Sequence, residues 1–223
     1  MAHKDLVKNH IPENKVSLDN YDKGFKAVYK AQKEGHAAFG KLKKQVDDCR
    51  AKESCKEMQR VLEEIRASIE KIQQAQDEAI VSRLDETVLG KLAESRAFTY
   101  EPMNKLQKQV CADEKRRDKL VKAGPSADPE KLREAKKVYK SSLREFLNKM
   151  EDYETKRLEE MKNILMEFCN SQLYYHCRAI ESWTAALKVC GNIDSTKWIA
   201  SIKKAVKEEK EMKNVDSDSD DDM

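Results

Sequence analysis

The chain has 223 residues, of which 38% are charged and 39% hydrophobic, and it contains only 6 glycines and 4 prolines. This composition is typical of long helices and coiled coils, and it excludes simple disorder because hydrophobic residues at helical spacing can bury a long, narrow core. The formal net charge of +3 is too small to indicate a nucleic-acid-binding protein by itself, so the distribution of the charges has to decide.

The first residues of the chain predict a flexible arm or at most a short helix. Residues 1–16 are polar and are interrupted by Pro12, so we expect a flexible N-terminal arm. They lack the apolar core of a signal peptide, and no run in the chain approaches about eighteen apolar residues. We therefore expect a cytoplasmic protein that meets membranes peripherally, on their cytosolic face.

Three long helices are predicted next, from apolar residues that recur at spacings of three and four. The first covers about residues 17–50. The second covers about 54–123 and is expected to kink near Pro102, because a proline removes a backbone donor and clashes with the preceding turn. The third covers 129–190, with Asp128 as its N-cap and Pro129 at its first position.

Because short turns join these helices, they must run antiparallel, which predicts an all-α, elongated three-helix coiled coil over residues 17–190. A short amphipathic helix is expected over 191–213, and the acidic tail over 214–223 is expected to be disordered. Ser217 and Ser219 each have an aspartate three residues later, a pattern typical of phosphorylation by an acidophilic kinase. A merely solubilising tail explains the same residues equally well.

Nothing in the sequence predicts catalysis. The six cysteines form no C-x-x-C pair, and their spacings suit neither zinc ligation nor a disulfide scaffold, so we expect reduced thiols. His176 and Cys177 are adjacent on a helix, where side chains point about 100° apart, so they cannot act as a catalytic pair. We therefore expect no enzyme activity, no cofactor and no metal site.

A short motif in the third helix carries a family resemblance. Residues 168–179 resemble the F-x-x-x-Q-L-x-Y-H-x-x-A pattern in the third helix of BAR domains, especially the endophilins. Glu101-Pro102-Met103 is similar to the kink sequence of the chibby-interacting BAR-domain proteins. The resemblance implies a crescent-shaped homodimer with a six-helix bundle at its centre, which binds curved anionic membranes. The residues assigned to the dimer or core seam are Phe168, Gln172, Leu173, Tyr175, His176, Ala179 and Trp183.

Positive charge is concentrated around the turn between the second and third helices. Residues 115–140 hold ten basic and four acidic residues, a net charge of +6. At about 1 kcal/mol for each basic residue close to an anionic leaflet, this cluster predicts salt-sensitive membrane binding. Ordinary solvated helix faces are the alternative interpretation. The predicted membrane-binding residues are Lys115, Arg116, Arg117, Lys119, Lys122, Lys131, Arg133, Lys136, Lys137 and Lys140.

These observations predict a membrane-binding homodimer of BAR type that senses or shapes curvature and docks on anionic phospholipid through its basic helix tips. The alternative is a coiled-coil cytoskeletal or scaffold adaptor that has protein partners only. A protein adaptor is expected to bind, if anywhere, through the tails. Nucleic acid is not an expected partner, because aromatic residues do not interleave with the basic cluster as base stacking would require.

Overall fold

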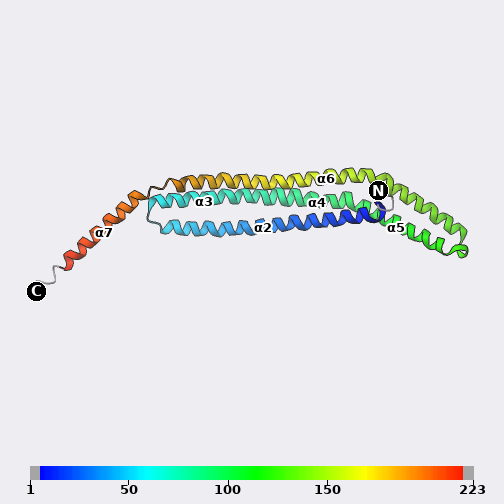
Figure 1. The fold of residues 1–223 in the computed structure, drawn as a ribbon, viewed down its shortest axis with the longest axis horizontal. Helices are drawn as coiled ribbons and strands as arrows, with labels where there is room; N and C mark the ends of the chain where they lie inside the picture. The colour runs from blue at the N-terminus through cyan, green and yellow to red at the C-terminus, as the bar shows by residue number, and fades with distance from the viewer. Residues whose placement is uncertain (1–5, 218–223) are drawn as a thin grey trace. The chain divides into compact units, whose positions relative to one another are not determined.

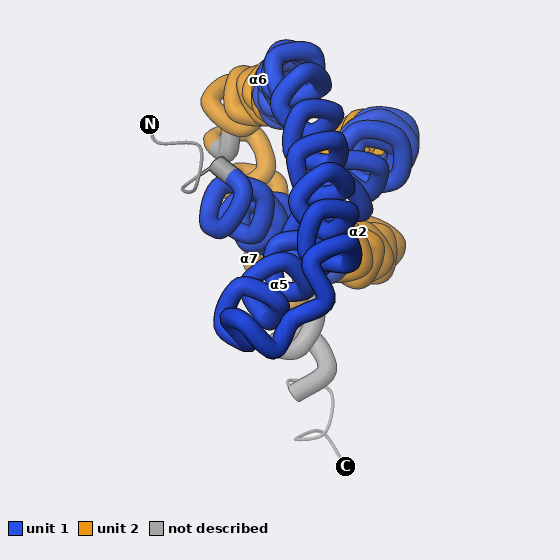
Figure 2. Tube along the Cα trace, turned by 90° about the vertical axis from the view of Figure 1, so that its right-hand side faces the viewer, with its two compact units in different colours: residues 1–35, 76–175 blue, residues 36–75, 176–223 orange. Residues whose placement is uncertain are grey.

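The computed structural model describes residues 6–217 of the chain. Over that range the residues form helices joined by short turns, without a β-strand (Figure 1). They divide into two compact units (Figure 2): unit 1 holds residues 6–35 and 76–175, and unit 2 holds residues 36–75 and 176–217. Each unit therefore takes one part of each long helical segment.

The helices follow one another with few residues between them. In chain order they are η1 (Leu6–His10), α2 (Ile11–Lys52), α3 (Lys56–Asp77), η2 (Glu78–Leu89), α4 (Gly90–Glu94), η3 (Ser95–Tyr100), α5 (Glu101–Lys122), η4 (Gly124–Ser126), α6 (Pro129–Gly191) and α7 (Ser195–Ser217). The run from α3 to α5 is continuous, so three long segments alternate in direction: α2, then α3 to α5, then α6. The predicted all-α, antiparallel three-helix fold is confirmed.

The N-terminal segment differs from the flexible arm expected over residues 1–16. The chain is π-helical in η1 and continues into α2 from Ile11, while residues 1–5 lie outside the described range. Val7 is 4% exposed and Ile11 is fully buried, and Gln107 Nε2 of α5 donates a hydrogen bond to the Val7 carbonyl at 2.9 Å. Because η1 runs directly into α2, the missing N–H of Pro12 leaves a carbonyl of η1 without its helical donor. Burial of two apolar side chains therefore orders this segment.

A polar cluster fastens the start of α2 to α6. His10 Nε2 lies 2.7 Å from Glu154 Oε1, and Arg157 Nη2 donates to Glu154 Oε2 at 2.7 Å. Beside them, Asn14 Nδ2 donates to the Tyr153 hydroxyl at 3.1 Å. Burial acts to raise the pKa of the Glu154 carboxyl, but the hydrogen bonds from Arg157 and His10 outweigh it and hold that pKa below its ordinary value. The Glu154 carboxylate is thus the charged centre of this contact.

The core of unit 1 explains why the segment after α3 is π-helical. Ile80, Leu84, Val88 and Leu92 recur every four residues and are each at most 2% exposed. Side chains spaced by four drift around an α-helix, which has 3.6 residues per turn, whereas the wider π-turns return them to one side. In this way η2 and α4 keep one apolar side within the core formed with α2 and α6.

Within unit 1 the second segment changes direction near the start of α5 (Figure 1). η3 ends at Tyr100 and α5 begins at Glu101, which puts the proline in the first turn of α5. Figure 1 shows α5 and the start of α6 leaving the line of α4 together. This junction lies where the sequence predicted a kink.

Unit 2 packs its parts of α2, α3 and α6 through aliphatic and small residues. Ile69 and Ile72 of α3 are fully buried, and Ser68 beside them donates a hydrogen bond to the Ser182 carbonyl of α6 at 3.0 Å. Because a serine has little side-chain volume, α3 and α6 come close together here. The last helix, α7, continues to Ser217 rather than ending near 213.

Candidate functional site

The turn between α5 and α6 brings the predicted membrane-binding residues to one end of unit 1. Gly124 in this turn adopts a φ of +57°, a left-handed conformation that glycine takes without strain. The next helix starts at Asp128, whose Oδ1 accepts hydrogen bonds from the backbone N–H groups of Lys131 (3.3 Å) and Glu130 (2.9 Å). These bonds lower the pKa of the Asp128 carboxyl, and the predicted N-cap is confirmed.

On α5 five lysines form one exposed stripe, which we call the α5 stripe. Its members are Lys105, Lys108, Lys115, Lys119 and Lys122. Their spacings of three, seven, four and three put them on one side of the helix, opposite its buried residues. In the described part of the chain, none of the five lies within ion-pairing distance of an acidic group. Lys105 and Lys108 were missed from the sequence, although their helical spacing from Lys115 could have found them.

On α6 the basic residues occupy two sides of the helix. One exposed group, the α6 stripe, consists of Arg133, Lys136, Lys137, Lys140 and Arg144. Arg144 lies four residues after Lys140 and was not predicted. Lys131 lies on another side of α6 and forms an exposed ion pair with Asp128 at 3.6 Å.

Lys131 and part of the α5 stripe share a surface groove of about 480 Å³ between α5 and α6. Its lining residues are Ala112, Lys115, Arg116, Lys119, Leu120 and Lys131. Four cations therefore surround a small apolar floor, an arrangement that attracts anionic groups. We call the two stripes and this groove together the basic hairpin.

Arg117 differs from the other predicted basic residues because it is half-buried and paired. Its guanidinium lies 2.5 Å from Asp118 Oδ1 and 3.6 Å from Glu114 Oε1, and it stacks 4.0 Å from the ring centroid of Tyr139. The hydrogen bond to Asp118 raises the pKa of Arg117. Arg117 therefore joins α5 to α6.

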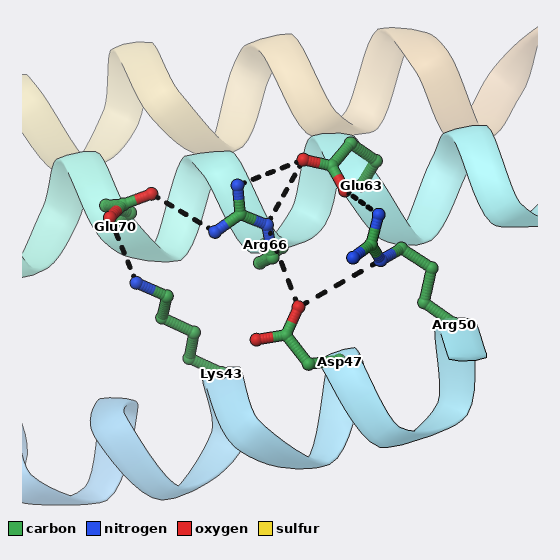
Figure 3. Close-up of polar contacts among 6 residues, drawn as sticks. All are labelled: Lys43, Asp47, Arg50, Glu63, Arg66 and Glu70. Carbon is green, nitrogen blue, oxygen red and sulfur yellow. Dashed lines mark hydrogen bonds and ion pairs between the residues drawn. The ribbon is translucent and has the colours of Figure 1, made fainter.

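A second charged cluster lies in unit 2, beside the turn between α2 and α3, and we call it the paired cluster (Figure 3). It consists of Lys43, Asp47, Arg50, Glu63, Arg66 and Glu70. Arg50 Nη1 lies 2.6 Å from Glu63 Oε2, and Lys43 Nζ lies 3.0 Å from Glu70 Oε1. A hydrogen bond from Arg66 lowers the pKa of Glu63, and one from Lys43 lowers the pKa of Glu70. Positive and negative charges thus offset one another at this turn.

The seven seam residues predicted on α6 divide between the inside and the outside of the chain. In unit 1, the ring centroid of Phe168 lies 5.0 Å from that of Phe25. Gln172 accepts a hydrogen bond from Gln32, whereas Leu173 is 62% exposed. Tyr175 is half-buried, and burial raises the pKa of its hydroxyl.

The other three predicted seam residues belong to unit 2. His176 is exposed and Ala179 is half-buried. Trp183 is 38% exposed, with its ring 6.4 Å from that of Phe39. The exposed side of α6 also carries large apolar residues outside the seven predicted seam residues: Leu158, Leu165, Met166, Ile180 and Leu187.

The remaining sequence features give no further site. All six cysteines are free thiols. Among the residues that the structure describes, no three His, Cys, Asp or Glu side chains gather as metal ligands would, and no helix is long and apolar enough to cross a membrane. Ser217 ends α7, but its side chain, like the whole of Ser219, lies outside the described residues.

Comparison with solved structures identifies the fold. The F-BAR domain of Hof1p is similar over 90% of this chain and 91% of its own, with a TM-score of 0.61 and 12% identity. The N-terminal I-BAR domain of IBARa from D. discoideum aligns over 92% of this chain and 95% of its own, with a TM-score of 0.46 and 12% identity. The first of these likenesses, at this low identity, shows that the chain has the fold of a BAR domain.

The sequence comparison gives the family. The sequence model of the FAM92 protein family matches residues 7–199, which is most of the chain. The protein therefore belongs to the FAM92 family, a family of BAR-domain-containing proteins. A search of curated protein sequences finds no significant match. The predicted membership of the BAR superfamily is confirmed.

Proposed function

We propose that this protein is a homodimer of BAR type that docks on anionic membranes through its basic hairpin and senses or shapes their curvature. The observation that carries the proposal is the exposure of the α5 and α6 stripes, whose ten basic side chains have no acidic partner among the described residues. A BAR-type role connected with membrane curvature is supported by the family and the fold. The unpaired charge supplies a means of attachment.

The expected strength of this contact follows from its charge. Each basic residue close to an anionic leaflet contributes about 1 kcal/mol, so a few lysines in contact give useful affinity. Attraction between exposed charges is screened over about 8 Å at physiological ionic strength. Binding through the hairpin should therefore fall steeply as salt is added.

The outer side of α6 supports self-association. Met166 and Leu173 in unit 1 are 52% and 62% exposed, and Ile180 and Leu187 in unit 2 are 66% and 72% exposed. Within each unit the two residues are seven apart, the repeat of a coiled-coil seam. A dimer formed along this side would hide large apolar side chains and would carry two basic hairpins, so membrane binding would be bivalent.

Sedimentation with vesicles tests the membrane part of the proposal. The protein should pellet with vesicles that contain phosphatidylserine, pellet less as NaCl is raised, and stay in solution with pure phosphatidylcholine. Comparing two vesicle sizes measures any preference for curvature. Equal binding to neutral vesicles, or none to anionic vesicles at low salt, would contradict the proposal and favour an adaptor with protein partners only.

Analytical ultracentrifugation tests the dimer. Wild type should sediment with twice the mass of one chain, and a variant with Leu173→Glu and Ile180→Glu should be monomeric because buried carboxylates would be unpaired. Arg178→Glu is the matched control, since it changes the net charge by the same amount and Arg178 is exposed on another side of α6. A seam variant that stays dimeric would place the interface on another side of the chain.

A further inference from the structure

The first turns of α7 present an apolar side to solvent. Ile199, Ile202 and Val206 are 48%, 45% and 46% exposed, and Trp198 beside them is half-buried. Spacings of three and four put the four residues on one side of the helix. In the described structure, therefore, the chain does not cover this side of α7.

The other sides of these turns carry lysines. Residues 195–207 contain four lysines and no acidic residue, a net charge of +4. The four are Lys197, Lys203, Lys204 and Lys207. The first acidic residue after this stretch is Glu208, whose Oε1 lies 3.7 Å from Lys204 Nζ. Before the stretch, Asp194 is the N-cap of the helix and accepts a hydrogen bond from the Thr196 N–H at 3.0 Å. The amphipathic part is thus a short, basic stretch of helix.

We infer that these turns of α7 lie in the headgroup region of an anionic bilayer, with Trp198 and its apolar neighbours toward the acyl chains. Helices that bind in this way combine an apolar side with lysines on the polar sides. A tryptophan ring is suited to the membrane–water interface because it is apolar with one polar N–H. Lysine stems are long enough to reach lipid phosphates while the apolar side is buried.

A membrane fits this surface better than a protein would. A second copy of the chain, or another protein, would have to cover four apolar side chains and also match the net positive charge of these turns. An anionic bilayer offers both at once. The inference rests on the proposed function only for the identity of the surface, and it adds a contact of a different kind: burial of apolar groups persists at high salt, whereas attraction to the basic hairpin does not.

Tryptophan fluorescence tests the inference directly. The chain has two tryptophans, so Trp183→Phe leaves Trp198 as the only one while keeping an aromatic ring beside Phe39. On addition of phosphatidylserine-containing vesicles, the emission of this full-length variant should shift to shorter wavelength and be quenched by brominated acyl chains. At high vesicle concentration the same changes should remain when Lys115, Lys119 and Lys122 are also changed to glutamate.

The possible results separate this inference from the proposed function. If the Trp183→Phe protein pellets with vesicles but its emission does not change, α7 does not insert and the basic hairpin stands as the contact. If it does not pellet at all, both proposals fail. Emission that is already at short wavelength without lipid and depends on protein concentration would assign the apolar side of α7 to a second copy of the chain.

A second variant keeps the inference testable by binding alone. Ile199→Ser, Ile202→Ser and Val206→Ser together should lower the fraction bound at high salt by about tenfold, since that fraction depends on apolar burial. Ala200→Ser, on a polar side of the same helix, should change it less than about twofold. Equal binding of the triple variant and wild type at high salt would overturn the inference.

Discussion

The two turns that join the long helical segments of this protein differ in the balance of their charges. Around the α2–α3 turn, residues 43–70 contain seven basic and seven acidic residues, and the paired cluster joins several of them (Figure 3). Around the α5–α6 turn, residues 115–140 contain ten basic and four acidic residues. Of those ten, Arg117 and Lys131 form ion pairs with described residues, and the others do not.

The difference indicates where each set of charges acts. Paired charges hold neighbouring helices together and leave little net attraction for an external ion. Unpaired like charges repel one another, so the basic hairpin weakens the fold slightly and gives nothing to packing. The function proposed above assigns this cluster to a polyanionic partner outside the chain, the anionic membrane surface.

Core substitutions should have the largest effect, and they should show that the two regions differ in charge rather than in packing. Phe146 in unit 1 and Ile72 in unit 2 are both fully buried. Phe146→Ala should lower the free energy of unfolding by about 3–5 kcal/mol and Ile72→Ala by about 2–5 kcal/mol, because each leaves a cavity. Urea unfolding followed by circular dichroism measures both. A loss below about 1 kcal/mol at either site would mean that its unit lacks a packed core.

The contact that holds the start of α2 beside the hairpin should depend on pH. Because the pKa of Glu154 is lowered in the folded chain, its contribution is present above the ordinary glutamate pKa of about 4.3 and is lost as pH falls through the lower folded value. Glu154→Gln should therefore cost about 1–2 kcal/mol of unfolding free energy near neutral pH and less in acid. Urea titrations at several pH values test this, and a cost that does not shrink in acid would rule it out.

Arg117, which adjoins the basic hairpin, and Lys119 within it should separate packing from binding. Arg117→Ala should cost about 1 kcal/mol of stability through its lost contacts with Asp118 and Tyr139. Lys119→Ala should change stability by less than about 0.5 kcal/mol but weaken binding to anionic vesicles about fivefold. Thermal unfolding and vesicle titration of both variants provide the comparison. The reverse order of effects would show that Arg117 faces the membrane.

The smallest effect should come from unbalancing the paired cluster. Glu63→Gln with Glu70→Gln would leave Arg50, Arg66 and Lys43 with fewer acidic partners and make this turn more positive. Binding to anionic vesicles should rise by no more than about threefold, because Arg50 and Arg66 stay close to Asp47. A rise as large as the loss of binding caused by changing Lys115, Lys119 and Lys122 to glutamate would show that net charge, and not its location, governs binding.

Much of the fold could be predicted from the sequence, because the apolar residues on the buried side of a long helix recur at spacings of three and four. The turn before Pro129 could also be predicted, because Gly124 and Asp128 act on the backbone close to them in sequence. Gly124 adopts a left-handed conformation, and Asp128 caps the helix that follows. The N-terminal segment was not, because Val7 and Ile11 are ordered by contacts with α5 and α6 far away in sequence. Local polarity over residues 1–16 could not show that those contacts exist.

The location of the candidate site could be predicted from the sequence, but not which of its residues pair within the chain and which face solvent. Counting charges found the basic hairpin, yet it could not separate Arg117, which pairs within the chain, from Lys119, which does not. Likewise Gln172 and Leu173 are neighbours in one motif, but one faces Gln32 and the other faces solvent. Such assignments depend on which side of a helix meets its neighbours. In the second segment, the π-turns of η2 and η3 change which residues lie on that side.

A matched pair of charge reversals tests the central claim most directly. One variant changes Lys115, Lys119 and Lys122 to glutamate in the basic hairpin, and the other changes Lys44, Lys52 and Lys56, three exposed and unpaired lysines of the described chain near the α2–α3 turn. Both alter the net charge equally. In co-sedimentation with phosphatidylserine-containing vesicles, the hairpin variant should lose about 100-fold in affinity and the other less than about fivefold. Equal losses would contradict the account, because binding would then follow total charge.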